Sequence, residues 1–285
     1  MLKIADSHVH FWDPRRLRYA WLDELPALNH ACLPDDLPAQ GPGWTVETLI
    51  FVQADCLPEQ GLAEVDWVAG LAARDPRVRT IVAFAPLEQG EGAHPVLEQL
   101  QSRPLVKGVR RLIQSEPLGF SQQPGFVAGV RLLADYGFSF DLCIKHPQLR
   151  DVIQLARRCP QVSFVLDHIG KPDIKSGQLD PWREHLAGLA ALPNVMCKLS
   201  GLVTEADWQR WQPADLRPYL DHVLEVFGVD RVMFGSDAPV LTLAATYPRW
   251  VETLLEATQA LSEAEKDKLF YANAAAFYKT SELRP

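Results

Sequence analysis

Two histidines separated by one residue have the spacing of a metal-binding pair. His8 and His10, in Asp6-Ser7-His8-Val9-His10, end the first strand-like run of the chain. Because side chains alternate along a strand, both imidazoles must face the same side, which in a barrel can be the lumen. Imidazole is a common ligand of zinc and similar divalent ions. The alternative is a pair of hydrogen-bonded core histidines, since a zinc site needs three or four ligands.

An aspartate follows the last strand-like run. Asp237 lies in Phe234-Gly235-Ser236-Asp237-Ala238-Pro239. Its carboxylate can bind a metal ion, or it can accept a proton from an attacking water molecule. An aspartate before Ala-Pro is also a good helix N-cap, which is the structural alternative.

Further polar residues lie at or near predicted strand ends. His168 ends the sixth run, where it can polarise a carbonyl or donate a proton to a leaving group, unless it is simply a buried core histidine. Lys171, Lys198 and Arg110 or Arg111 can bind substrate oxygens or stabilise developing negative charge, although most such side chains are solvated surface.

These candidates come from different runs. His8, His10, His168 and Asp237 lie at the ends of the first, sixth and eighth runs, and barrel enzymes place their chemistry at that end of the strands. Their conjunction favours one active site over separate structural roles. His146, just after the fifth run, is a weaker candidate ligand, because a register error of one residue would turn it away.

Eight strand-like runs alternate with helix-like segments along the chain. This alternation is typical of βα units around a parallel sheet, and the placement of polar residues at the strand ends favours a closed barrel. We therefore predict an α/β fold, a single (β/α)8 barrel that occupies residues 1–285 as one domain. The predicted runs are Lys3–His10, Thr48–Ala54, Thr80–Leu87, Val106–Ile113, Phe138–Ile144, Ser163–His168, Asn194–Leu199 and Arg231–Ser236.

The predicted connections include two long irregular segments, residues 13–47 and 169–181. Long loops in compact domains tend to be functional, so both are expected to form walls or lids of the pocket. Helix-like spacing of apolar residues, as in 149–156 and 216–227, predicts helices that pack against the outside of the sheet.

Composition excludes several classes of protein. Apolar residues make up 47% of the chain and charged residues 22%, with no run long enough to span a membrane. A net charge of −8 disfavours a nucleic-acid-binding surface. The start of the chain has no leader-like pattern, so a cytoplasmic setting is expected. The five cysteines lack CxxC spacing and are expected to be reduced: Cys32, Cys56, Cys143, Cys159 and Cys197.

Taken together, the motifs resemble the amidohydrolase superfamily, with HxH on the first strand, histidine near the sixth and aspartate after the eighth. More narrowly, the chain is similar to the barrel hydrolases that include L-fuconolactonases, L-rhamnonolactonases and pyrone-dicarboxylate lactonases. The stretch 197–208 is most similar to the fuconolactonase branch. The matching segments are 6–12, 52–54, 107–110, 166–172, 197–208 and 234–239.

The resemblance implies a hydrolase that opens a sugar lactone. Asp237 would deprotonate water, and His168 would stabilise the oxyanion or protonate the leaving ring oxygen. One divalent ion, first of all zinc, would be held by His8, His10 and Asp237, although some relatives work without a metal. The substrate would be contacted by Arg110, Lys171, Lys198 and Trp12, with Trp21 and Trp182 as further surfaces.

Two departures from the family pattern concern the substrate and the metal. Ala238 follows the aspartate where relatives often have Trp, which leaves the identity of the lactone open. The fourth run offers Lys107 and Arg110 in place of a bridging lysine, which argues against a two-metal centre. Alternatives are a pyrone-dicarboxylate-type lactonase, a metal-dependent decarboxylase and a non-catalytic ligand-binding barrel. The oligomeric state stays open.

Overall fold

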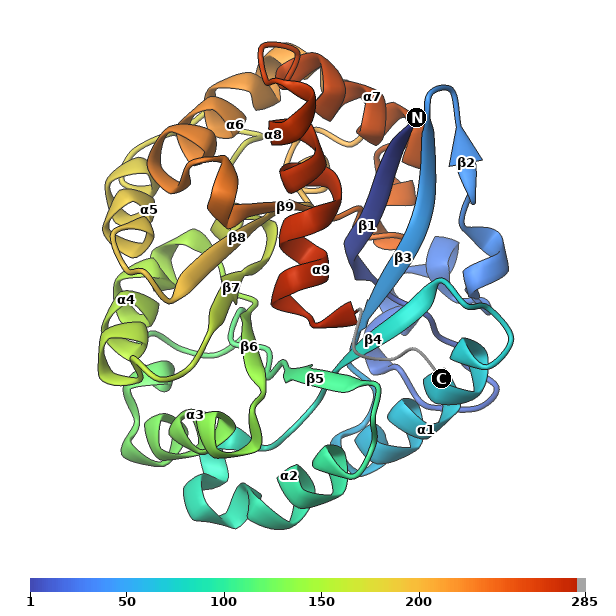
Figure 1. The fold of residues 1–285 in the computed structure, drawn as a ribbon. Helices are drawn as coiled ribbons and strands as arrows, with labels where there is room; N and C mark the ends of the chain where they lie inside the picture. The colour runs from blue at the N-terminus through green and yellow to red at the C-terminus, as the bar shows by residue number, and fades with distance from the viewer. Residues whose placement is uncertain (281–285) are drawn as a thin grey trace.

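The computed structural model describes residues 1–280, which form a barrel of eight parallel strands surrounded by helices (Figure 1). The prediction of a single (β/α)8 barrel is confirmed. Each predicted run overlaps one strand of the barrel. The strands, in their order around it, are β1 (Leu2–Val9), β3 (Trp44–Val52), β4 (Val78–Ala83), β5 (Val106–Val109), β6 (Ser139–Leu142), β7 (Phe164–Leu166), β8 (Val195–Leu199) and β9 (Val232–Phe234).

The barrel closes between its last and first strands, just beyond their regular ends. A parallel bridge joins Val9 to Ala238. The amide of His10 donates to the carbonyl of Ala238 at 2.8 Å, and the amide of Asp237 donates to the carbonyl of His8 at 2.8 Å. The closure therefore brings the two histidines of β1 beside Asp237. An additional strand, β2 (Gln40–Gly41), pairs antiparallel with β3 and was not predicted.

The helices cover the outside of the barrel (Figure 1). Apolar residues at helical spacing face the strands, as predicted: α4 buries Leu149, Val152, Ile153 and Ala156. The helices are α1 (Gly61–Ala72), α2 (His94–Gln101), α3 (Pro124–Tyr136), α4 (Leu149–Arg158), α5 (Trp182–Ala190), α6 (Pro213–Phe227), α7 (Tyr247–Ala257), α8 (Glu263–Asp267) and α9 (Asn273–Phe277). None of the helices in residues 1–280 has the length and apolar character needed to cross a bilayer.

The last helical segment lies across one end of the barrel instead of along its side (Figure 1). A turn of π-helix, Lys268–Ala272, joins α8 to α9. From this segment the buried Ala274 and Tyr278 pack with strand residues into a separate apolar cluster. The hydroxyl of Thr80, near the start of β4, donates to the carbonyl of Tyr278 at 3.3 Å. The segment thus closes the end where the strands begin. The strand residues of the cluster are Ala5, Ile50, Val52, Val82, Val165 and Met233.

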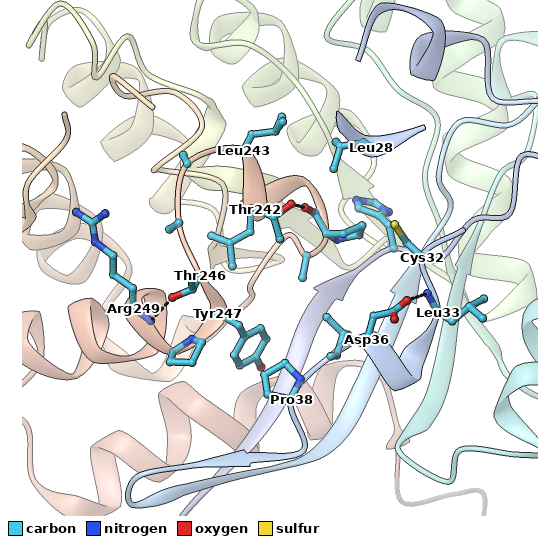
Figure 2. Close-up of a pocket in the computed structure, with 18 of the residues that line it drawn as sticks. Leu28, Cys32, Leu33, Asp36, Pro38, Thr242, Leu243, Thr246, Tyr247 and Arg249 are labelled. Carbon is cyan, nitrogen blue, oxygen red and sulfur yellow. Dashed lines mark hydrogen bonds between the residues drawn. The ribbon is translucent and has the colours of Figure 1, made fainter. Parts of the chain in front are cut away.

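The long loops lie at the opposite end. Residues 28–38 of the first loop face residues 238–249 across a groove of about 960 Å³, which also reaches His10 (Figure 2). The second loop, 169–181, contributes Lys171 to a neighbouring cavity. All five cysteines are buried and free, as expected from their spacing.

Candidate active site

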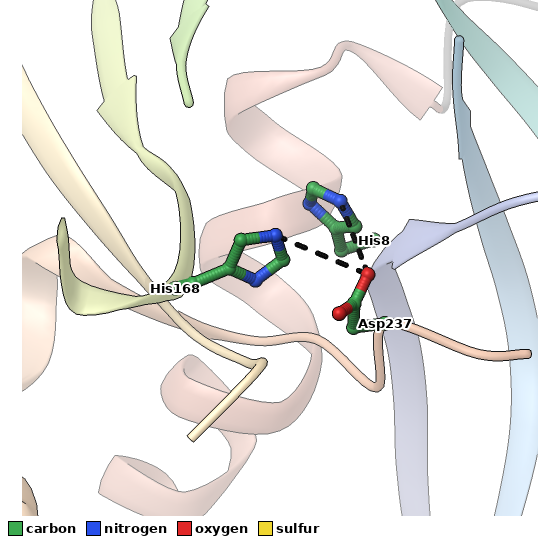
Figure 3. A group of neighbouring side chains, drawn as sticks. All are labelled: His8, His168 and Asp237. Carbon is green, nitrogen blue, oxygen red and sulfur yellow. Dashed lines mark ion pairs between the residues drawn. The ribbon is translucent and has the colours of Figure 1, made fainter. Parts of the chain in front are cut away.

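Three imidazoles surround one carboxylate oxygen at the carboxyl end of the barrel. His8 belongs to β1, His10 follows it, His168 follows β7 and Asp237 follows β9. Asp237 Oδ1 lies 3.3 Å from His10 Nε2, 3.7 Å from His8 Nε2 and 3.9 Å from His168 Nε2. Figure 3 shows His8 and His168 pointing toward Asp237. The predicted convergence of these four residues is therefore present in the structure.

This donor set fits a tetrahedral metal ion. Zinc–nitrogen bonds of 2.0–2.1 Å place the ligand atoms of a tetrahedral site about 3.3 Å apart. The Nε2 atoms of His8 and His10 are 3.2 Å apart, and His8, His168 and Asp237 offer ligand atoms that all lie within 4.8 Å of one another. Neutral imidazoles with one carboxylate are the usual ligands of such an ion.

Outer partners fix the orientation of each imidazole. His10 Nδ1 donates to the carbonyl of Val52 at 2.7 Å, which leaves its Nε2 lone pair facing Asp237. His168 Nδ1 lies 2.9 Å from the hydroxyl of Ser200. Such contacts to the far nitrogen are what holds a ligating or catalytic histidine in one tautomer and one orientation.

Two charged groups contact His8 Nδ1, the ring nitrogen that faces away from Asp237. Asp167 Oδ1 lies 3.2 Å from His8 Nδ1, and Lys198 Nζ lies 3.1 Å from the same atom. Lys198 also pairs with Asp167 at 3.0 Å, and Arg110 Nη1 lies 3.3 Å from Asp167 Oδ2. His8, Asp167, Lys198 and Arg110 are all buried, so these charges are compensated by one another.

Strained backbone and one glycine position these side chains. His168 and Asp237 adopt left-handed φ values of 53° and 62°, which non-glycine residues rarely do outside functional sites. Gly201 is needed beside them, because a Cβ at that position would lie 2.5 Å from His168 Nδ1. The helix after Asp237 begins at Val240 and is preceded by Pro239, so the helix-capping alternative for Asp237 is not supported.

Burial sets the charge state of the site. It lowers the pKa of His168 to about 4 and lowers the pKa values of His8 and His10 as well. The three imidazoles are therefore neutral at neutral pH. Burial acts to raise the pKa of Asp237, but the neighbouring histidines, His168 first, hold that pKa below its ordinary value. An ionised carboxylate among neutral imidazoles suits both metal binding and proton acceptance.

A cavity of about 290 Å³ opens onto this cluster. His10, His168 and Asp237 line it together with Arg110 and Lys171. Aromatic and apolar walls come from the first long loop, and polar groups from other loops add to the lining. These additional lining residues include Trp21, Leu25, Asp55, Gln114 and Cys143.

Several residues proposed from the sequence lie elsewhere. Trp12 is buried and donates to the carbonyl of Leu28, and Trp182 donates to the carbonyl of Ile169. Lys198 is fully buried within the barrel. Among the described residues that line the cavity, neither these three nor His146 is included. The roles of Trp12 and Lys198 in binding substrate therefore remain predictions without support from this geometry.

Sequence reasoning gave no role to Asp167, although it precedes His168 in the motif. The sequence did contain an indication, because the carboxylate of Asp167 directly follows the apolar run 164–166. A charge buried at that place needs a buried partner to compensate it. Asp55 and Gln114 carried no comparable signal. Gln114 accepts a 2.7 Å hydrogen bond from Lys171 across the cavity, a contact that depends on loop geometry.

Comparisons with known proteins identify relatives that match nearly the whole chain. Residues 5–280 match the family described as amidohydrolase. The chain is 36% identical to an L-fucono-1,5-lactonase of Burkholderia multivorans over 97% of this chain and 96% of the relative. It is 23% identical to an L-rhamnono-gamma-lactonase of Scheffersomyces stipitis over 95% and 97%.

Solved structures give the same result. A crystal structure of an amidohydrolase from Burkholderia multivorans with bound zinc has a TM-score of 0.85 and 34% identity, and covers 98% of this chain and 99% of that chain. A probable 2-pyrone-4,6-dicarboxylic acid hydrolase from Acinetobacter baumannii has a TM-score of 0.71 at 16% identity, over 97% and 99%. That second likeness shows the shared fold alone.

Proposed function

The chain belongs to the amidohydrolase family, and from this we propose that it is an enzyme that hydrolyses a sugar lactone of the L-fucono- or L-rhamnono-lactone type. Two lactonases among its relatives match almost the whole chain, one of them at 36% identity. The observation that carries the proposal is the convergence of three histidine Nε2 atoms on Asp237 Oδ1 at one cavity.

The residues present also support a metal-assisted reaction. His8, His10 and Asp237 would hold one divalent ion, with zinc as the first choice because of the imidazole-rich donor set and the zinc bound by a similar amidohydrolase. When bound, the ion would supply a positive charge that acidifies water and stabilises negative charge on oxygen.

Asp237 acts as the proton carrier in the proposed mechanism. Its ionised carboxylate takes a proton from water as the water oxygen attacks the ester carbonyl of the lactone. When the carbonyl re-forms, the bond to the ring oxygen breaks and this oxygen takes up the proton from Asp237. The product is an open-chain hydroxy acid, which releases a proton to the solvent at neutral pH.

His168 stabilises the negative charge that develops on the carbonyl oxygen. In the proposed mechanism the Ser200 hydroxyl donates to Nδ1, so that the proton of the neutral imidazole lies on Nε2, which faces Asp237 and the cavity. A pKa of about 4 makes His168 a neutral hydrogen-bond donor rather than an imidazolium acid. Of the two roles expected for His168, the geometry thus supports charge stabilisation. Arg110 and Lys171 add positive charge at the cavity wall.

A hydrolysis screen tests this proposal. Proton release is followed with a pH indicator for L-fucono-1,5-lactone, L-rhamnono-gamma-lactone and 2-pyrone-4,6-dicarboxylate, each with and without added zinc. Enzyme-free reactions measure spontaneous opening. We expect enzyme-dependent hydrolysis of at least one sugar lactone. Hydrolysis of the pyrone dicarboxylate alone, or carbon dioxide release from a hydroxybenzoate without lactone opening, would overturn the assignment.

A further inference from the structure

The closing helical segment reaches the active-site network through one tyrosine. Tyr278 is fully buried, and its hydroxyl donates to Asp141 Oδ2 at 2.8 Å. Its ring also lies under the ammonium group of Lys198, with Nζ 5.3 Å from the ring centroid. Tyr278 therefore contacts both members of a buried ion pair inside the barrel.

Lys198 connects that tyrosine to His8. Three groups surround the ammonium group: Asp141 Oδ2 at 2.5 Å, Asp167 Oδ1 at 3.0 Å and His8 Nδ1 at 3.1 Å. Because Lys198 is fully buried, solvent cannot replace any of these partners. The position of the ammonium group is fixed by the balance between Asp141 on one side and the Asp167–His8 pair on the other.

We propose that Tyr278 is a positioning residue for the active site, which fixes Asp141 and Lys198 and thereby the orientation of the His8 imidazole. This proposal rests on the proposed function only for the role of His8 as a metal ligand. Since His8 Nδ1 contacts Lys198, a displacement of the ammonium group rotates the ring whose Nε2 faces Asp237.

The hydroxyl group, rather than the bulk of the ring, carries this effect. Among residues 1–280, Asp141 Oδ1 has no hydrogen-bond partner, and Oδ2 is shared between Lys198 and Tyr278. Removal of the hydroxyl leaves Lys198 to compensate the carboxylate alone. We expect the ammonium group to move toward Asp141 and away from His8, while the phenyl ring still fills the apolar cluster.

The test compares Tyr278→Phe with Ala274→Gly. Ala274 is buried in the same cluster of the same segment, and glycine there weakens the helix by about 1 kcal/mol without touching the network. Each protein is measured for zinc affinity by chelator competition, for kcat and KM on its best lactone, for thermal unfolding and for the NMR signals of the His8 imidazole.

In Tyr278→Phe we expect zinc affinity and kcat to fall by about 3- to 30-fold, with KM within about twofold of wild type, because Tyr278 lies away from the cavity. The His8 signals should shift in Tyr278→Phe and not in Ala274→Gly. Unchanged His8 signals and kinetics in Tyr278→Phe, or equal losses in both variants at equal destabilisation, would overturn the proposal. If the wild type hydrolyses no sugar lactone, the proposed function fails, whereas the His8 signals still decide the role of Tyr278.

Discussion

Asp237 is the residue on which the chemistry of this site depends. Its Oδ1 faces the Nε2 atoms of all three histidines, and its left-handed backbone allows the side chain to turn into the cavity just after β9. In the proposed mechanism the same carboxylate carries a proton and helps to hold a metal ion. A substitution that preserves its shape but removes its basicity therefore separates the chemical role from a structural one.

Asp237→Asn should fold normally and lose most hydrolysis. The amide nearly matches the carboxylate in shape but is a poor proton acceptor, and general-base catalysis contributes about 100- to 10,000-fold. We expect kcat to fall by at least that range, with thermal unfolding close to wild type. Turnover and unfolding are measured on Asp237→Asn and Asp237→Ala. Nearly normal hydrolysis by the Asn variant would remove the proposed base from the mechanism.

Residue types could be predicted better than their individual contacts. The sequence placed His8, His10, His168 and Asp237 at strand ends, because strand alternation and strand order determine where such side chains lie. Lys198 was expected in the pocket, yet it lies inside the barrel with Asp141 and Asp167. The carboxylates that pair with Lys198 lie 31 and 57 residues before it in the sequence. The periodicity of apolar residues does not show such distant partners.

At the scale of elements, the sequence predicted strands well and their ends poorly. All eight runs overlap a strand, but β3 begins at Trp44, four residues before its predicted run, and the prediction for β5 continued to Ile113, whereas the strand ends at Val109. The chain leaves the sheet at Arg110, which lines the cavity with Leu112, and Ile113 then packs in the core. The pattern of apolar residues did not predict that the helical segment 268–277 lies across the end of the barrel. The apolar residues of such a helix have the same spacing as those of a helix that packs along the side of the barrel.

The loop after β8 provides a sharp test of how an element supports His168. Gly201→Ala would place a Cβ 2.5 Å from His168 Nδ1 and would strain a residue with φ 68°. Gly177→Ala is the matched control, because Gly177 has φ 69° but no described atom within 4 Å of its added Cβ.

Both variants should lose about 1–2 kcal/mol from backbone strain. Only Gly201→Ala should lose activity, by at least tenfold, because displacement of a catalytic group by about 1 Å costs about 100-fold. Thermal unfolding and kcat are measured side by side. Equal activity in the two alanine variants would show that the position of His168 does not depend on this close approach.

At the scale of the whole molecule, buried charges argue for one metal ion. Cys143, Asp167 and His168 form a second group of possible ligands. However, Asp167 already pairs with Lys198 and Arg110. Burial acts to raise the pKa of Asp167, but these cations, Lys198 first, hold that pKa well below its usual range. A second divalent ion would have to lie beside two fixed positive charges.

Elemental analysis of protein incubated with zinc and then dialysed should therefore find at most one equivalent. If that ion is bound, removal by a chelator should lower the thermal unfolding temperature, since a ligand present at 100 times its Kd stabilises a protein by about 2.7 kcal/mol. Titration of the chelated protein with zinc should restore the temperature at one equivalent. Two tightly held equivalents would show that the Asp167 group also binds metal.

The closing segment also has a consequence for the order of events during synthesis. Tyr278 lies 137 residues after Asp141 in sequence, and a ribosome adds about 5–20 residues per second, so Asp141 precedes its tyrosine partner by roughly 7 to 27 s. Until then the base of the lumen is open, and water can solvate Asp141 and Lys198. Dehydration of this ion pair is therefore a late step, and a nascent chain that lacks Tyr278 has a barrel without a finished centre.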